Sequence, residues 1–329
     1  MIVSMSVCQQ QAAQLPLVNF TGGLNMDSFN PRHHKEKVVV VMGATGTGKS
    51  RLAIDLARQF GGEVVNSDKI QVYEGLDIVT NKVTEEECHG VPHHLLGFVD
   101  PNINYTSSDF KLHASLTMDS IISRDRLPII AGGSNSFIEA LVDHEMKFSR
   151  RYEFCLVWVD VMLPVLRSFI QARVDKMVDM GLVNEVREFF NPSGDYSIGL
   201  RRAIGVPEMD RFLRAELQSV NEETLVIFLE QAVNKIKSNT FKLACKQIQK
   251  IDRLKRLWRG KNYVYKLDAT QVFLRSGKEA NKAWDELVVG PSTSIVEQFL
   301  RGGEHITTFS PPSPTLSSAI NSQTIIFTR

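Results

Sequence analysis

One glycine-rich segment has the spacing G-x-x-x-x-G-K-S, a pattern that binds phosphate groups. Its glycines let backbone N–H groups turn toward phosphate oxygens, and the helix that it opens adds a partial positive charge. Its lysine contributes a full charge, and its terminal serine offers a hydroxyl ligand for Mg²⁺. We therefore predict a phosphate-binding loop composed of Gly43, Ala44, Thr45, Gly46, Thr47, Gly48, Lys49 and Ser50. The loop indicates a diphosphate or triphosphate ligand and leaves the reaction open.

A carboxylate, Asp68, directly follows the next short apolar segment, residues 63–66. In a parallel α/β sheet the carboxyl ends of the strands share one edge, so Asp68 is expected beside the phosphate loop. At that place a carboxylate can bind Mg²⁺ or act as a general base toward an acceptor. Spacing alone favours a simpler role for Asp68, in a turn or a helix cap.

Four apolar segments predict buried strands, and segments of helical length separate them. The strands are expected at residues 38–42, 63–66, 128–131 and 154–160, and a helix is expected from Ser50 to Phe60. Alternating strands and helices are typical of a parallel sheet with ligands at the strand carboxyl ends. The predicted fold class is α/β, with a P-loop NTPase-like parallel sheet core and a smaller helical domain.

The chain divides into five predicted parts. Residues 1–36 read as an N-terminal extension, either a transit peptide or a disordered terminus, because acids are scarce there. The phosphate-loop core covers 37–160, and a helical domain covers 161–235, beginning with a helix over Leu163–Phe190. A long helix near Glu222–Trp258 leads back to the core over 236–289. Residues 290–329, rich in Ser, Thr, Gly and Pro, are expected to form a disordered tail.

Composition excludes several classes of protein. Lys plus Arg is 38 and Asp plus Glu is 37, a formal net charge of +1, so overall charge favours no polyanionic partner. The four cysteines lack the C-x-x-C spacing of zinc sites, which argues against a disulfide framework or a zinc ribbon. No apolar run approaches the roughly 20 residues that cross a bilayer, so no membrane span is expected.

Seven blocks, in this order along the chain, resemble the isopentenyltransferase family. That family includes tRNA dimethylallyltransferases and adenylate dimethylallyltransferases. The residues of the blocks here are similar to those of the plant adenylate type. The resemblance covers about residues 37–290. The blocks are the phosphate loop, Asn66–Tyr73, Asp77–Lys82, Gly90–Leu96, Ala131–Ser136, Arg201–Gly205 and Asn239–Gln247.

The resemblance implies transfer of a dimethylallyl group from dimethylallyl diphosphate to the N6 amine of ADP or ATP, and less well AMP. This is the first step of cytokinin biosynthesis. Asp68 is then the base, and Mg²⁺ assists the diphosphate. Lys49 and Arg202 stabilise the leaving diphosphate, although a one-residue slip in the alignment replaces Arg202 with Arg201. We further expect a monomer that acts in the plastid rather than the cytoplasm.

Other residues are candidates for supporting roles. Ser134, Asn135 and Ser136 follow a strand and two glycines, and are expected to contact the acceptor. Asp160 ends a strand and is a second candidate Mg²⁺ ligand, although an N-cap role is slightly favoured. Lys242 and Lys246 lie on a basic helix face that is expected to contact acceptor phosphates, with a solvated face as the alternative. A structural role is expected for His93 and His94, with a direct catalytic or ligand role as the alternative.

The main alternative is a tRNA dimethylallyltransferase that modifies an adenosine next to the anticodon. No cysteine follows Cys245, so we expect no C-terminal zinc finger like that of eukaryotic tRNA-modifying relatives, although bacterial tRNA enzymes also lack it. Near-neutral charge also favours a small acceptor, and nucleic acid is not the expected partner. A second alternative is a P-loop kinase or nucleotide switch, which the seven blocks disfavour.

Overall fold

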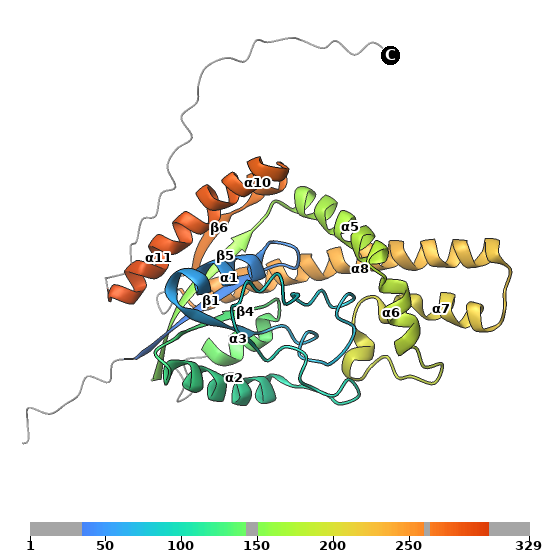
Figure 1. Ribbon diagram of the computed structural model, residues 1–329, viewed down its shortest axis with the longest axis horizontal. Coiled ribbons are helices and arrows are strands. Elements are labelled where there is room, and N and C mark those ends of the chain that lie inside the picture. The colour runs from blue at the N-terminus through green and yellow to red at the C-terminus, as the bar shows by residue number, and fades with distance from the viewer. Residues whose placement is uncertain (1–34, 143–150, 260–263, 303–329) are drawn as a thin grey trace, which may run out of the picture. The chain divides into compact units, whose positions relative to one another are not determined.

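A computed structural model describes residues 35–142, 151–259 and 264–302. Within them one six-stranded sheet is formed by β1 (Glu36–Gly43), β2 (Gly62–Asn66), β3 (His93–His94), β4 (Leu127–Ala131), β5 (Tyr152–Asp160) and β6 (Val264–Asp268) (Figure 1). The strand order is β3-β2-β4-β1-β5-β6, and every neighbouring pair is parallel. The predicted parallel α/β core is therefore confirmed.

The central strand β1 is buried on both faces. Its successive β-branched side chains point alternately into two hydrophobic clusters, one on each face of the sheet. Val38, Val40 and Met42 belong to one cluster of buried side chains, whereas Val39 and Val41 belong to the other. Side chains of a strand point alternately to opposite faces, so a strand covered on both sides reads as a continuous apolar run. This pattern holds the phosphate loop, which follows β1, at the centre of the sheet edge.

Helices cover both faces of the sheet (Figure 1). The first cluster includes buried residues of α2, α3 and α8, and the second includes those of α1, α10 and α11. The long helices α5 and α8 also pack on each other. The helices are α1 (Lys49–Phe60), α2 (Ser107–Ile122), α3 (Asn135–Val142), α5 (Leu163–Asp179), α6 (Leu182–Phe189), α7 (Val206–Leu217), α8 (Glu222–Leu257), α9 (Thr270–Phe273), α10 (Gly277–Trp284) and α11 (Gly290–Arg301).

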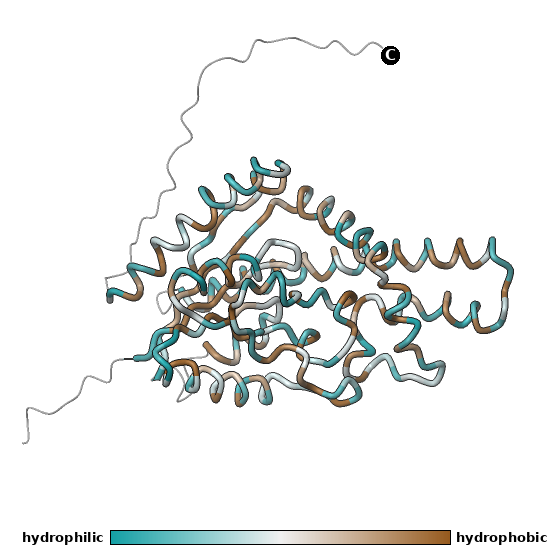
Figure 2. The backbone as a smooth tube through the Cα atoms, viewed as in Figure 1, coloured by the Kyte–Doolittle hydropathy of each residue, from teal (hydrophilic) through white to brown (hydrophobic). Residues whose placement is uncertain are grey.

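Helix α8 links the helical portion of the chain to the core. Its apolar and polar residues alternate along its length, as Figure 2 shows, and this period buries one side only. Its N-terminal half packs on α7 and α5, and residues further along reach α3 and β1. The predicted long helix near Glu222–Trp258 is confirmed, and it carries side chains to the edge of the sheet.

Two predictions about helices were wrong. The helix expected over Leu163–Phe190 is two helices, α5 and α6, because Gly181 adopts a left-handed φ of 107° between them. The tail expected from residue 290 begins instead with α11, because Ile295, Val296 and Phe299 are buried there. The expected extension, up to residue 34, and the rest of the tail, from 303, lie outside the described residues.

Candidate active site

A cavity of about 680 Å³ lies at the carboxyl ends of β1, β2 and β4. Its walls come from the loops after these strands and from α5, α8, α9 and α10. The charged residues that line it are Lys49, Arg51, Lys69, Asp68, Arg173, Arg202 and Arg275. Six of these seven are cations, in a chain whose net charge is only +1. The lining is therefore suited to ligands that carry several negative charges.

The phosphate loop has the backbone that its sequence predicts. Gly46 and Gly48 have φ values of 87° and 90°, a left-handed region that glycine adopts without strain. Lys49 Nζ donates a hydrogen bond to the Ala44 carbonyl oxygen at 2.7 Å, and Thr47 Oγ1 donates to the same oxygen at 3.0 Å. Burial lowers the pKa of Lys49 to about 8, although the Asp68 carboxylate opposes this shift. The loop therefore has the backbone geometry that a phosphate-binding loop requires.

Part of the loop faces the cavity and part supports it. Thr45, Gly46, Gly48, Lys49 and Ser50 line the cavity. The remaining loop residues, Gly43, Ala44 and Thr47, are outside the lining, where they shape the backbone. The sequence therefore predicted the segment correctly but did not separate ligand-facing positions from supporting ones.

Asp68 lines the same cavity, as the sequence predicted. Its backbone N–H donates to Asn66 Oδ1 at 3.1 Å, and its Oδ1 accepts a hydrogen bond from Ile70 N–H at 2.9 Å. Its charge acts to raise the pKa of Lys49 and of Arg173, against the effect of their burial. It is the one carboxylate among the described lining residues. A base for a proton released in this cavity would thus be Asp68.

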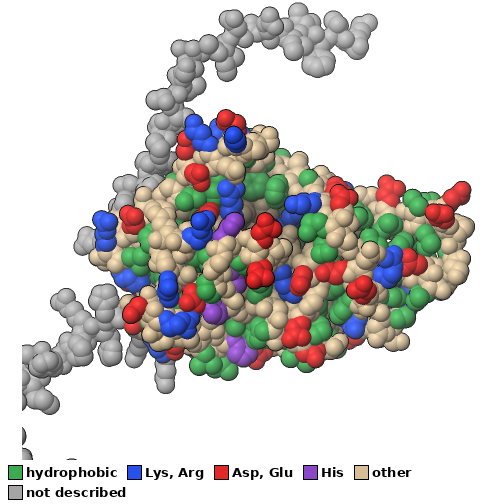
Figure 3. Space-filling model, in the orientation of Figure 1, with side chains coloured by type: hydrophobic (Ala, Val, Ile, Leu, Met, Phe, Trp, Pro, Cys, Tyr) green, Lys and Arg blue, Asp and Glu red, His purple; other side chains and the backbone are tan. Residues whose placement is uncertain are grey.

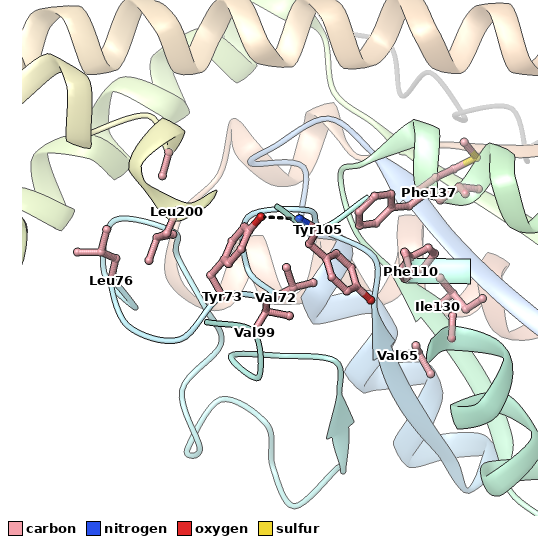
Figure 4. Close-up of a cluster of buried hydrophobic side chains, with 14 of the residues drawn as sticks. Val65, Val72, Tyr73, Leu76, Val99, Tyr105, Phe110, Ile130, Phe137 and Leu200 are labelled. Atoms are coloured by element: carbon pink, nitrogen blue, oxygen red, sulfur yellow. Dashed lines mark hydrogen bonds between the residues drawn. The ribbon is translucent and has the colours of Figure 1, made fainter. Parts of the chain in front are cut away.

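The structure distinguishes the two neighbouring arginines. Arg202 lines the cavity and donates from Nη2 to the Tyr73 hydroxyl oxygen at 3.3 Å, whereas its Nε is buried without a partner. That hydroxyl also accepts from Tyr105 N–H at 3.1 Å, which anchors it in the hydrophobic cluster of Figure 4. Arg201 lies outside the cavity, with its guanidinium 4.7 Å from the centre of the Phe189 ring. Arg202 is therefore the arginine of the pair that a ligand would meet.

Arg173 is a site residue that the sequence analysis missed. It lies on α5, and its Nη2 donates to Thr45 Oγ1 of the phosphate loop at 2.9 Å. Its Nε is buried without a partner, and burial lowers the pKa of its guanidinium. A signal existed in the sequence, because Arg173 falls between the buried Ile170 and Met177 on the apolar side of α5. A charge on that side calls for an anionic partner.

Three predicted acceptor contacts do not line the cavity. Ser134 Oγ accepts a hydrogen bond from Lys69 N–H at 2.8 Å, so it holds the loop that carries Asp68. Asn135 is buried and donates from Nδ2 to the Gln247 carbonyl oxygen at 3.0 Å. Ser136 is exposed on α3. The glycines before them, Gly132 and Gly133, reach the cavity instead, because the turn directs the following side chains away.

The predicted metal ligand Asp160 also lies outside the cavity lining. Its carboxylate forms an ion pair of 2.7 Å with Lys266, which β6 brings alongside. The sequence analysis did not predict β6, so this partner was not foreseen. Ser50 lines the cavity, whereas Asp160 pairs with a lysine outside its lining, so the pairing of these two residues as metal ligands stays a prediction.

Lys242 and Lys246 project from the exposed side of α8 and do not line the cavity. The residues of α8 that do are Ile236, Thr240, Leu243 and Gln247, which recur at helical spacing. The predicted contact of the two lysines with acceptor phosphates stays a prediction, and it now requires phosphates that extend beyond the cavity.

The two histidines occupy different environments. His94 Nε2 lies 2.7 Å from Glu63 Oε2, which also pairs with Arg124 at 2.7 Å. Burial acts to raise the pKa of the Glu63 carboxyl, but its hydrogen bonds with His94 and Arg124 outweigh burial and hold that pKa below its usual value. His93 lines the cavity, and burial lowers its pKa. The structural interpretation thus fits His94 best.

Comparison with known proteins places this site in a family. A family model described as IPP transferase matches residues 71–150 and 143–253. Adenylate isopentenyltransferase 5, chloroplastic, of Arabidopsis thaliana is 58% identical over 88% of each chain. Adenylate isopentenyltransferase 7, mitochondrial, of the same plant is 50% identical over 92% of each.

Solved structures are similar at a greater distance. A eukaryotic dimethylallyltransferase acting on tRNA is 22% identical, with a TM-score of 0.70 over 84% of this chain and 82% of that one. The tRNA isopentenylpyrophosphate transferase of Bacillus halodurans is 23% identical, with a TM-score of 0.63 over 81% of this chain and 99% of that one. These likenesses bear on the fold alone. From the family model and the plant relatives together, the chain is a member of the IPP transferase family.

Proposed function

We propose that this chain is an adenylate dimethylallyltransferase, which transfers a dimethylallyl group from dimethylallyl diphosphate to the N6 amine of ADP or ATP, and less well AMP. This is the first step of cytokinin biosynthesis. The observation that carries the proposal is a cavity with one carboxylate, Asp68, among six cations. Two anionic substrates need such cations, and an amine that loses a proton needs one base. The plant relatives, named adenylate isopentenyltransferases and up to 58% identical, support the same activity.

The residues divide the chemistry between them. The N6 amine forms a bond to the allylic carbon C1 of the donor while the bond from C1 to the diphosphate oxygen breaks. Asp68 accepts the proton that the amine loses, and the electron pair of the broken bond leaves with the diphosphate. Lys49, Arg202 and Arg173 stabilise the charge that builds on that leaving group, together with the N–H groups of the phosphate loop.

Mg²⁺ is the proposed cofactor, and the cavity fits it in one respect. The described residues hold no group of three or more His, Cys, Asp or Glu side chains that suits a metal. Mg²⁺ commonly takes one or two protein ligands and completes its shell with water and substrate phosphates. The Ser50 hydroxyl lines the cavity and would be that protein ligand. When bound, Mg²⁺ neutralises diphosphate charge.

A product assay tests the function. Purified protein, Mg²⁺ and dimethylallyl diphosphate are incubated with AMP, ADP, ATP or unmodified tRNA, and the products are analysed by mass spectrometry. We expect a prenyl mass gain on ADP and ATP, a smaller yield on AMP, and none on tRNA. Gain on tRNA alone would assign the chain to RNA modification, since one structural relative is a dimethylallyltransferase acting on tRNA. No gain on any acceptor would refute prenyl transfer altogether.

We also propose that the protein acts in the plastid. Two relatives are named chloroplastic and a third mitochondrial, which supports an organelle. A fluorescent protein fused to the C-terminus of the full chain should co-localise with chloroplasts, and deletion of residues 2–34 should leave it in the cytosol. Mitochondrial fluorescence of the full chain would contradict the choice of organelle.

In the part of the chain that the structure describes, no helix is long and apolar enough to cross a bilayer.

A monomer is the proposed assembly state. Light scattering on the purified protein should give a mass near the 37.0 kDa of one chain. Twice that mass would refute the monomer.

A further inference from the structure

Gln247 connects the phosphate loop to the loop beside the base. It lies on α8 and is only 6% exposed. Its Oε1 accepts a hydrogen bond from Thr45 N–H at 2.7 Å, and its Nε2 donates to the Gly133 carbonyl oxygen at 2.9 Å. One amide side chain therefore bonds two loops that follow different strands, β1 and β4. Only a group with an acceptor and a donor side by side satisfies both partners.

The contact between Gln247, Gly133 and Asp68 is close. A Cβ atom on Gly133 would lie 2.5 Å from Gln247 Nε2 and 3.2 Å from Asp68 Oδ2, so a side chain at this position has no room. Two further hydrogen bonds connect backbone groups of the same region to side chains. Asn135 donates to the Gln247 carbonyl oxygen at 3.0 Å, and Ser134 Oγ accepts from Lys69 N–H at 2.8 Å.

From this network we infer that Gln247 is a positioning residue, which fixes the distance between the donor's diphosphate and the base Asp68. The role rests on the proposed function, because it concerns the geometry of that transfer. The phosphate loop carries the diphosphate, and the Gly133 loop abuts Asp68, so the amide sets one loop against the other. A misplacement of about 1 Å between reacting groups costs on the order of a hundredfold in rate.

An isosteric substitution separates the two bonds. In Gln247→Glu the carboxylate still accepts from Thr45 N–H, but it offers no donor to the Gly133 carbonyl when ionised. When protonated, its O–H replaces that donor. Burial raises the pKa of a carboxyl, whereas the cations Lys49, Arg173 and Arg202 of the same cavity lower it, so the pH at which the carboxyl is protonated measures the balance of the two effects. The variant should therefore regain activity as the pH falls.

The expected result is a loss of kcat that depends on pH. At about pH 8, Gln247→Glu should lower kcat roughly a hundredfold. Its Kd for inorganic diphosphate with Mg²⁺ should also be raised there, because an ionised carboxylate adds a negative charge to the cavity lining. As the pH falls and the carboxyl is protonated, kcat should rise toward wild type and the Kd should return to within about threefold of it, since the bond to Thr45 remains. Gln247→Met, which loses both bonds, should raise the Kd as well and show no recovery.

Matched controls isolate residue 247. Gln249→Glu adds the same charge two residues further along α8, at an exposed position, and should behave as wild type at every pH. The ionisable groups around the site are the same in all variants, and Gln247→Met, which is uncharged at residue 247, reports the pH dependence that these groups impose by themselves. They are Lys49, Asp68, Lys69, Arg173 and Arg202.

Several outcomes would overturn the inference. One is a Gln247→Glu enzyme with wild-type kcat at about pH 8, and another is a loss of kcat that does not depend on pH. If Gln247→Glu does not fold, a folded Gln247→Met protein with unchanged kcat and diphosphate Kd would also refute it. Failure of the proposed function is distinct: wild type would then bind diphosphate but prenylate no adenylate, and the diphosphate Kd of Gln247→Met would still test the link to Thr45.

Discussion

At the scale of single residues, the site holds a buried lysine beside a half-buried carboxylate, Lys49 and Asp68. Lys49 has no ion pair among the described residues and bonds instead to the Ala44 carbonyl oxygen, so it is free to exchange that bond for a phosphate. The charge of Asp68, which lines the same cavity, acts to raise the pKa of Lys49 against the effect of burial. No hydrogen bond or ion pair joins the two groups among the described residues, so each is available to a different part of the reaction.

The role of Asp68 as base predicts a specific loss of turnover. Asp68→Asn keeps the shape of the side chain and its acceptor for Ile70 N–H, but it removes a basic oxygen. We expect kcat to fall by roughly 10² to 10⁴, the usual contribution of general base catalysis. Inorganic diphosphate should bind at least as tightly as before, because a negative charge has left the cavity. Unchanged kcat in steady-state assays would remove Asp68 from this role.

The lowered pKa of Lys49 predicts that diphosphate affinity depends on pH. Protonated lysine binds the anion, and in the free protein its pKa is about 8. Affinity should thus be highest below pH 8 and decrease as the pH rises through that value, with proton uptake on binding. Calorimetry of Mg²⁺ and diphosphate in two buffers of different ionisation enthalpy measures this uptake.

Lys49→Arg is the control for that experiment, because a guanidinium stays charged over the whole range. Its affinity should show only the pH dependence of the diphosphate itself. An equal dependence in both proteins would mean that Lys49 keeps its proton throughout, contrary to the effect of its burial.

At the scale of elements, short turns decide which side chains reach the cavity. The turn Gly199–Arg202 presents Arg202 to the cavity and Arg201 to Phe189. Arg202→Gln should weaken diphosphate binding roughly tenfold, the value of one hydrogen bond to a charged group. Arg201→Gln, its matched control, should change that Kd less than twofold. The reverse order in a titration with diphosphate would place Arg201 at the site.

The same scale explains what the sequence predicted and what it did not. The phosphate loop and the buried strands were predictable because neighbouring residues determine the backbone there. Examples are Gly46 and Gly48 in the loop and the buried run Val38–Met42 in β1. The ion pair of Asp160 with Lys266 was not predictable from the sequence, because it depends on β6, which joins the sheet more than a hundred residues later. Arg173 is intermediate, since its position on the apolar side of α5 was readable but was not used.

At the scale of the whole chain, charge is distributed unevenly. Net charge is +1, yet the cavity lining holds six cations and one carboxylate. Elsewhere several basic residues pair with acids, as Arg253 does with Glu139 at 2.6 Å and Lys237 with Asp175. On the face of Figure 3, Lys and Arg are interspersed with Asp and Glu. This arrangement suits anions that enter a cavity better than a long polyanion on the surface.

That distribution predicts how the protein discriminates between acceptors. Binding of tRNA requires several surface cations that replace counterions along the backbone, which makes its affinity fall steeply with salt. Here six cations line the cavity, whereas the face of the molecule in Figure 3 mixes both signs of charge, so unmodified tRNA should not compete with ADP at about 0.15 M salt, where surface charges are screened beyond about 8 Å. The KM for dimethylallyl diphosphate should still rise with salt, because the cavity's cations act on it directly. Competition assays over a salt series test both statements. Inhibition by tRNA that weakens steeply with salt would instead indicate an RNA surface and support the tRNA alternative.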